Sequence, residues 1–212
     1  MDLHLWLAYV AAAFLIAVSP GSGAVLSMSH GLAYGVRKAS ATIGGLQLGL
    51  LLILLVAGAG VGSLLLASEL AFNVVKVLGA LYLIYLGWCQ WRAGGASPLA
   101  GADEVPAGSW RKRCLTGFLT NATNPKGIIF MVAVLPQFLT DARPLRSQLL
   151  VIAVTTLAVD TVVMHGYAAS ASAMRRLLRS ARAVQAQNRV FGGLLMAVGA
   201  GLFFVQRVAR PA

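Results

Sequence analysis

Two interrupted apolar runs decide the fold of this chain: Ser19-Pro20-Gly21-Ser22-Gly23 divides the first, and Asn121-Ala122-Thr123-Asn124-Pro125-Lys126-Gly127 divides the fourth. Proline lacks the N–H that a helix needs and clashes with the carbonyl four residues earlier, so each stretch bends or ends a helix. Backbone groups freed in this way cannot stay unpaired in lipid, and such breaks persist only inside a bundle or beside a water-filled cavity. We therefore expect both breaks to face other helices.

The composition is that of a membrane protein. Of the 212 residues, 58% are hydrophobic and 11% are charged, and the mean hydropathy is +0.80. A soluble domain carries roughly 25% charged residues. Six apolar runs reach or approach the roughly 20 residues that cross a bilayer, at 4–28, 40–67, 70–91, 115–139, 147–171 and 188–206. The sequence predicts an all-α integral membrane protein with six transmembrane helices, of which helices 1 and 4 are broken.

The predicted helices divide into two halves of three. Residues 1–92 form the first half and residues 114–212 the second, and the segment 93–113, rich in Ala, Gly and Pro, joins them as a cytoplasmic linker. Because each half crosses the membrane an odd number of times, the second half has the opposite topology. Paired breaks in corresponding helices of inverted repeats are typical of a transporter binding site near the middle of the membrane.

The positive charge orients the chain. Lys and Arg gather in the segments after helices 1, 3 and 5, which share one side: Arg37, Lys38, Arg92, Arg111, Lys112, Arg113, Arg175, Arg176, Arg179, Arg182 and Arg189. The other side has fewer: Arg143, Arg146, Arg207 and Arg210. The positive-inside rule then places both termini in the periplasm of a bacterial inner membrane. Loop charge of this kind argues against nucleic-acid binding, despite the net charge of +11.

The stretch from Ser172 to Arg189 repeats apolar residues at helical spacing and puts arginines on another face. This pattern has two interpretations. It predicts either a helix lying on the anionic lipid of the inner leaflet or a cytoplasmic extension of helix 5.

Two ionisable residues fall deep within predicted spans. From the helical rise, Asp160 lies roughly 20 Å and Lys126 roughly 16 Å from the faces where their spans begin. A charge at that depth costs at least about 2.5–3.5 kcal/mol and needs a cavity or a partner. In one interpretation Asp160 binds a proton or a substrate amine and Lys126 binds a substrate carboxylate. In the other, a structural Lys126–Asp160 ion pair joins helices 4 and 5.

Other polar residues are weaker candidates. Gln47, Thr155 and Thr156 are predicted either to line the cavity or to form interhelical hydrogen bonds. Ser22 lies between glycines, but nothing in the sequence aligns a base such as His165 with it, so a serine enzyme is not expected. The two cysteines have no metal-ligand spacing, and no metal or cofactor is predicted.

The motifs around the breaks resemble those of the lysine exporter (LysE/RhtB) family. They are Ser19-Pro20-Gly21, Leu119-Thr120-Asn121, Asn124-Pro125-Lys126, Gly79-Ala80-Leu81-Tyr82-Leu83 with Gly87, and Pro136-Gln137-Phe138. The resemblance covers nearly the whole chain. It implies a six-helix exporter of amino acids or their derivatives that is driven by the proton gradient, with a substrate pathway along Pro20, Gly21, Asn121, Asn124, Pro125 and Lys126. The family usually has a second proline, often followed by an acidic or polar residue, where this chain has Ser22-Gly23, and the substrate therefore stays open.

The resulting hypothesis is a secondary transporter that alternates access between its two halves. The substrate would lie between the breaks, beside Ser19, and a proton on Asp160 would reset the cycle. Two alternatives remain at this point, a structural or regulatory membrane subunit that moves no solute and a passive channel. The expected partners are an amino-acid-like substrate, protons and membrane lipids, and a homo-oligomer is left open.

Overall fold

A computed structural model describes residues 1–67, 69–94, 108–140, 143–178 and 180–203, and these ranges are almost wholly helical. The elements are α1 (Leu3–Val18), α2 (Ser22–Tyr34), α3 (Val36–Ala67), α4 (Glu69–Arg92), α5 (Trp110–Ala122), α6 (Pro125–Val134), the 3-10 helix η2 (Leu135–Phe138), α7 (Leu145–Leu178) and α8 (Ala181–Leu202). The predicted all-α class is confirmed for the described residues.

Both predicted breaks are present. α1 and α2 meet at 59°, and α5 meets the segment Pro125–Phe138 at 51°. α3 over Val36–Gly60 and α7 over Leu145–Ala171 are long and apolar enough to cross a membrane, and counting each bent pair as one span raises the number to four. α4 and α8 have 24 and 22 residues, but their described residues are not counted among the helices that are long and apolar enough to cross a membrane. The described residues thus support two to four spans, where six are predicted.

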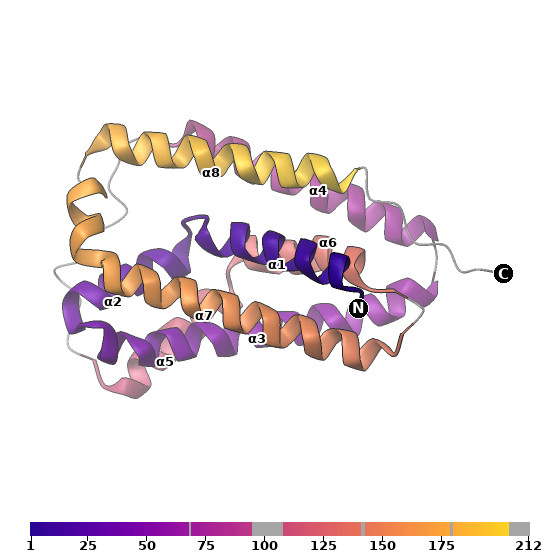
Figure 1. The fold of residues 1–212 in the computed structure, drawn as a ribbon, viewed down its shortest axis with the longest axis horizontal. Helices are drawn as coiled ribbons and strands as arrows, with labels where there is room; N and C mark the ends of the chain where they lie inside the picture. The colour runs from indigo at the N-terminus through magenta and orange to yellow at the C-terminus, as the bar shows by residue number, and fades with distance from the viewer. Residues whose placement is uncertain (68, 95–107, 141–142, 179, 204–212) are drawn as a thin grey trace.

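The helices run side by side along the long axis of the molecule (Figure 1). α4 packs on α8 along one side, α1 and α6 lie in the middle, and α3, α5 and α7 occupy the other side. The N-terminus and the end of α8 lie at one end of the bundle (Figure 1). The α2–α3 and α7–α8 connections, the end of α4 and the start of α5 lie at the opposite end, which we call the basic end because the described arginines and lysines of those segments gather there.

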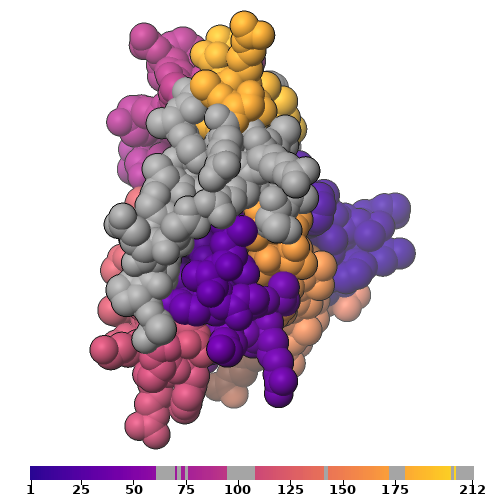
Figure 2. All heavy atoms as spheres, turned by 90° about the vertical axis from the view of Figure 1, so that its left-hand side faces the viewer, coloured from indigo at the N-terminus to yellow at the C-terminus, as the bar shows by residue number. Residues whose placement is uncertain are grey.

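At the basic end the first and second halves of the chain are in contact. Figure 2 looks onto this end and shows the start of α3 beside the start of α5. The Arg113 Nε donates a hydrogen bond to the Lys38 carbonyl at 3.2 Å. Of the predicted linker, residues 95–107 lie outside the described residues, and α5 already begins at Trp110.

The stretch from Ser172 to Arg189 is not a separate surface helix. α7 continues to Leu178 and α8 begins at Ala181, so the stretch belongs to two long helices. The alternative interpretation, an extension of helix 5, describes the part up to Leu178. Among the basic residues used for orientation, Arg179, Arg207 and Arg210 lie outside the described residues.

Small residues bring the helix backbones into contact. A Cβ atom placed on Gly45 of α3 would lie 1.9 Å from the Cys114 carbonyl oxygen of α5, and one on Gly117 would lie 2.1 Å from the Thr42 carbonyl oxygen. Gly87 of α4 and Gly192 of α8 face each other in the same way, with 2.5 Å between a built Cβ and the opposite carbonyl oxygen. Close approach of this kind is how membrane helices gain packing energy without a hydrophobic driving force.

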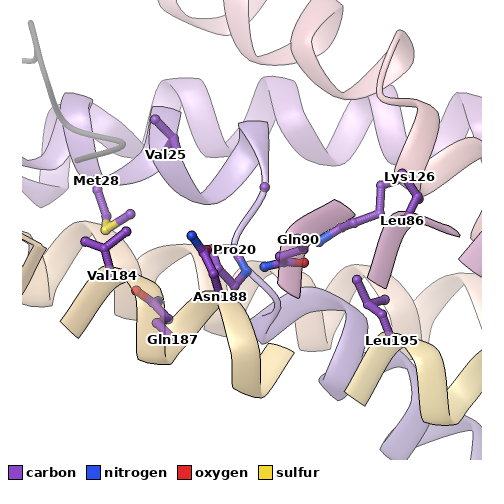
Figure 3. Close-up of a pocket in the computed structure, with 11 residues that line it drawn as sticks. Pro20, Val25, Met28, Leu86, Gln90, Lys126, Val184, Gln187, Asn188 and Leu195 are labelled. Atoms are coloured by element: carbon purple, nitrogen blue, oxygen red, sulfur yellow. The ribbon is translucent and has the colours of Figure 1, made fainter. Parts of the chain in front are cut away.

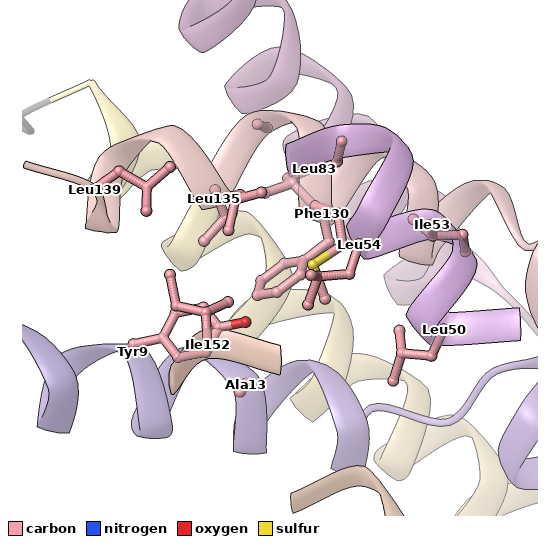
Figure 4. Packing of buried hydrophobic residues seen from close by; sticks show 14 of the residues in the cluster. Tyr9, Ala13, Leu50, Ile53, Leu54, Leu83, Phe130, Leu135, Leu139 and Ile152 are labelled. Carbon is pink, nitrogen blue, oxygen red and sulfur yellow. The ribbon is translucent and has the colours of Figure 1, made fainter. Parts of the chain in front are cut away.

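The largest hydrophobic cluster surrounds α6 and η2. Phe130, Leu135, Leu54 and Ile152 pack there beside Tyr9 of α1 (Figure 4). The Tyr9 hydroxyl lies 2.5 Å from the Thr156 hydroxyl, which also donates to the Ile152 carbonyl at 2.7 Å. This packing holds α1 against η2 and α7 on the side of the breaks away from the basic end.

Candidate functional site

The carbonyl groups at the end of α1 are bound by side chains from the second half of the chain. A helix leaves its last four carbonyls without intrahelical partners. The Lys126 Nζ donates to the Ser19 carbonyl at 2.6 Å and to the Ile16 carbonyl at 3.2 Å, and the Tyr167 hydroxyl donates to the Val18 carbonyl at 2.5 Å. A cation at a helix C-terminus also interacts favourably with the helix dipole. Lys126 therefore joins the two breaks.

The second break is ordered by its own asparagines. The Asn124 Oδ1 accepts from the Lys126 backbone N–H at 3.1 Å and starts α6, and Pro125 occupies the first helical position, where no N–H is needed. The Asn121 Nδ2 donates to the Leu46 carbonyl of α3 at 2.8 Å. The motif therefore places the Lys126 side chain at the start of a short helix that is tied to α3 through α5.

Asp160 of α7 lies in the same region. Its Oδ2 accepts a hydrogen bond from the Gln47 Nε2 at 2.7 Å, whereas the buried Gln47 Oε1 has no hydrogen-bond partner within the described part of the chain. Within the described residues Arg143 forms a surface salt bridge with Asp2, whereas Lys126 and Asp160 do not form one with each other.

Lys126 and Asp160 line one small cavity of about 40 Å³. The other polar or glycine residues around it are Ser19, Gly21, Gly23, Asn121 and Asn124. A volume of this size holds water where several polar groups converge. The structure thus brings most of the sequence-predicted site residues to one small cavity. Pro20 and Pro125 lie at the two helix breaks beside it.

A second, larger cavity of about 310 Å³ lies between α2, α4, α6 and α8 (Figure 3). It shares Gly21 and Lys126 with the small cavity. Its other lining residues are Pro20, Val25, Met28, Leu86, Gln90, Val184, Gln187, Asn188 and Leu195. Because Gln90 is near the end of α4 and Gln187 near the start of α8, the cavity extends from the breaks toward the basic end.

Apolar side chains surround a smaller void beside Ile16 and Ser19 at the end of α1. Leu15 of α1, Phe130 of α6, and Phe191, Leu194 and Val198 of α8 enclose only about 10 Å³. The larger cavity therefore extends from the breaks toward the basic end, and the void of about 10 Å³ lies among apolar side chains of α1, α6 and α8.

The other predicted residues lie elsewhere. The Thr156 hydroxyl bonds to α1 and to its own helix, and the Thr155 hydroxyl accepts from the Trp6 Nε1 at 3.0 Å, so both form the predicted interhelical hydrogen bonds. The His165 Nε2 lies 3.1 Å from the Ser40 Oγ, and its Nδ1 lies 2.8 Å from the Thr161 carbonyl. His165 is therefore engaged between α3 and α7, as expected of a packing residue.

Sequence reasoning missed four residues of this region: Tyr167, Gln90, Gln187 and Asn188. The three carboxamides fall at the ends of predicted spans, where polar residues are ordinary. A helical register would have found Gln187 and Asn188, since they share one face with Val184 and Leu195. No local signal marks Tyr167, because its partner carbonyl is far away in the chain.

Comparisons with known proteins identify the family of this chain. The sequence model of the family described as LysE type translocator matches residues 14–206. A homoserine/homoserine lactone efflux protein of Salmonella typhi is 40% identical over 94% of this chain and 96% of its own length. An uncharacterized membrane protein of Vibrio cholerae is also 40% identical, with the same coverage. A leucine efflux protein of Enterobacter is 30% identical over 99% of this chain and 95% of its own. No solved structure gives a significant match.

Proposed function

Because the chain belongs to the LysE type translocator family, we propose that it exports small amino acids or their derivatives across the bacterial inner membrane. The observation that carries this proposal is the hydrogen bonding of Lys126 to the end of α1, at the junction of the two cavities. A cavity of about 310 Å³ is at the lower limit of the roughly 300–1,000 Å³ typical of small-molecule sites. Relatives named for the efflux of homoserine, homoserine lactone and leucine support a small neutral substrate.

An amino-acid zwitterion has the charges needed to replace the contact between Lys126 and α1. Its carboxylate would bind the Lys126 ammonium, and its own ammonium would take over the Ser19 and Ile16 carbonyls. Each group at the break keeps a partner in this exchange, so binding leaves no buried charge or carbonyl unsatisfied. Binding would also break the hydrogen bonds between Lys126 of α6 and the end of α1. Substrate binding would thereby allow the two halves of the chain to move relative to each other. Pro20, Gly21, Asn121, Asn124 and Pro125 would shape the pathway at this point.

We assign the proton-binding step of the transport cycle to Asp160. The Gln47 amide now donates to the Asp160 carboxylate. A proton on that carboxylate would be a donor, and rotation of the Gln47 amide would offer its Oε1, which is buried without a partner, as the acceptor. Gln47 would therefore stabilise both protonation states of Asp160, which is what a reversible proton site in a membrane requires.

The architecture that fits this cycle is the predicted one of six spans in two inverted repeats. Residues 1–92 and 114–212 would form the repeats and 93–113 a cytoplasmic linker, with both termini in the periplasm. In that orientation the basic end would face the cytoplasm and its anionic lipid, and the large cavity would extend toward the side from which an exporter takes its substrate.

Purified protein in liposomes tests the function. Vesicles loaded with labelled L-homoserine should release label faster than protein-free vesicles, and an imposed pH difference should change the rate. A structural or regulatory subunit would release none. A passive channel would release label at a rate that the pH difference does not alter. Either result would refute the proposal.

A further inference from the structure

We propose that Gln90, Gln187 and Asn188 form a side-chain subsite that selects amino acids with a neutral, hydrogen-bonding side chain and rejects those with a cationic one. This inference rests on the proposed function. The charged ends of the substrate would bind at the breaks. The rest of the large cavity would then hold the substrate side chain.

The three carboxamides come from two helices and face one space. Gln187 and Asn188 lie on the face of α8 that also carries Val184 and Leu195, and Gln90 lies one turn after Leu86 on α4. Figure 3 shows Gln90, Gln187 and Asn188 around Pro20, with the Lys126 side chain extending from α6 toward Gln90. A substrate held at Lys126 would therefore direct its side chain toward these groups.

The carboxamides keep hydrogen-bonding capacity for a ligand. Gln187 forms no hydrogen bond with the described residues. Gln90 uses its Oε1, which accepts from the Ser19 Oγ at 3.4 Å, and Asn188 uses its Nδ2, which donates to the Gly94 carbonyl at 3.3 Å. The Gln90 Nε2, the Asn188 Oδ1 and both ends of the Gln187 amide remain. The subsite thus offers donors and acceptors without a charge.

This chemistry discriminates between side chains of equal size. A hydroxyl or a carbonyl satisfies the carboxamides, whereas a methyl group in the same place leaves them without a partner. An ammonium group would meet no carboxylate among the described residues that line this cavity, since the charged residue among them is the cation Lys126. The subsite consequently disfavours cationic amino acids by charge and aliphatic ones by the loss of hydrogen bonds.

Three isosteric amino acids test the subsite: L-homoserine, L-norvaline and L-2,4-diaminobutyrate carry a hydroxyl, a methyl and an ammonium group at the same position. The initial efflux of each is measured from liposomes containing the wild-type protein or a variant. The wild type should prefer homoserine over both analogues. Gln187→Leu should reduce the ratio of homoserine to norvaline by about three- to tenfold. Gln187→Glu should raise diaminobutyrate efflux relative to homoserine by about tenfold or more, since a carboxylate binds the ammonium.

Gln185→Leu is the matched control, because Gln185 is an exposed carboxamide on the same helix that does not line the cavity. It should leave both ratios unchanged. If the wild type moves none of the three compounds, the proposed function fails and the subsite with it. If the wild type moves homoserine but Gln187→Leu and Gln187→Glu leave the ratios as they were, the subsite alone is refuted. Gain of diaminobutyrate efflux cannot result from misfolding, so Gln187→Glu stays decisive even where Gln187→Leu expresses poorly.

Discussion

Replacing Lys126 with methionine separates the structural and transport roles of the junction. The substitution keeps a long apolar side chain but removes the ammonium that binds the Ser19 and Ile16 carbonyls. Hydrogen bonds to a charged group contribute about 1.5–3 kcal/mol each. Water in the small cavity can recover part of this loss. We therefore expect Lys126→Met to lower the free energy of unfolding by about 2–4 kcal/mol.

Efflux by Lys126→Met should fall by more than the loss of folded protein explains. If Lys126 binds the substrate carboxylate, losing that contact costs about 1.5–3 kcal/mol of substrate binding, which is a decrease of about 10- to 150-fold in efflux at low substrate concentration. The assays are thermal unfolding in detergent and efflux from liposomes at matched protein content.

Two further variants calibrate the result. Tyr167→Phe removes the neighbouring bond to the Val18 carbonyl and should cost about 0.5–1.5 kcal/mol of stability. Lys112→Met removes an exposed lysine at the start of α5 and should change neither property. Wild-type efflux in a destabilised Lys126→Met protein would mean that the lysine only caps α1, and the proposed exchange with the substrate would be wrong.

Three other changes test separate parts of the structure. Asp160→Asn should abolish the response of efflux to an imposed pH difference yet preserve exchange of labelled for unlabelled substrate, and a pH-driven rate equal to the wild type would remove Asp160 from the coupling step. Gly45→Ala should lower the free energy of unfolding by about 1–3 kcal/mol, because its Cβ would meet the α5 backbone. Gly44→Ala is the control: its Cβ would have no atom within 4 Å, and thermal unfolding should show no change. Thr156→Val should cost about 0.6–1.5 kcal/mol through the lost bond to Tyr9, and an unchanged unfolding midpoint would show that this short contact contributes nothing.

The breaks were predictable because their cause is local. Pro20 and Pro125 remove a backbone donor at a known place, and Asn124 one residue earlier is a favourable N-cap. The depth of Asp160 and Lys126 followed in the same way from helical rise and hydropathy. The hydrogen-bond partners of Asp160 and Lys126 could not be predicted in this way. A sequence alone suggests that the two opposite charges pair, whereas in the structure Lys126 binds the carbonyls at the end of α1.

The sequence by itself determined the helical class, the two interruptions, the segregation of positive charge toward one end, and the family, since each depends on residues close together in the chain. Only the tertiary structure decided toward which end the large cavity extends from the breaks, which carbonyls Lys126 binds, and that the carboxamides of α4 and α8 face one cavity. These features depend on how glycine contacts such as Gly87 with Gly192 set the separation and rotation of helices far apart in sequence. No local pattern encodes that geometry, because each contact has a meaning only when both helices are in place.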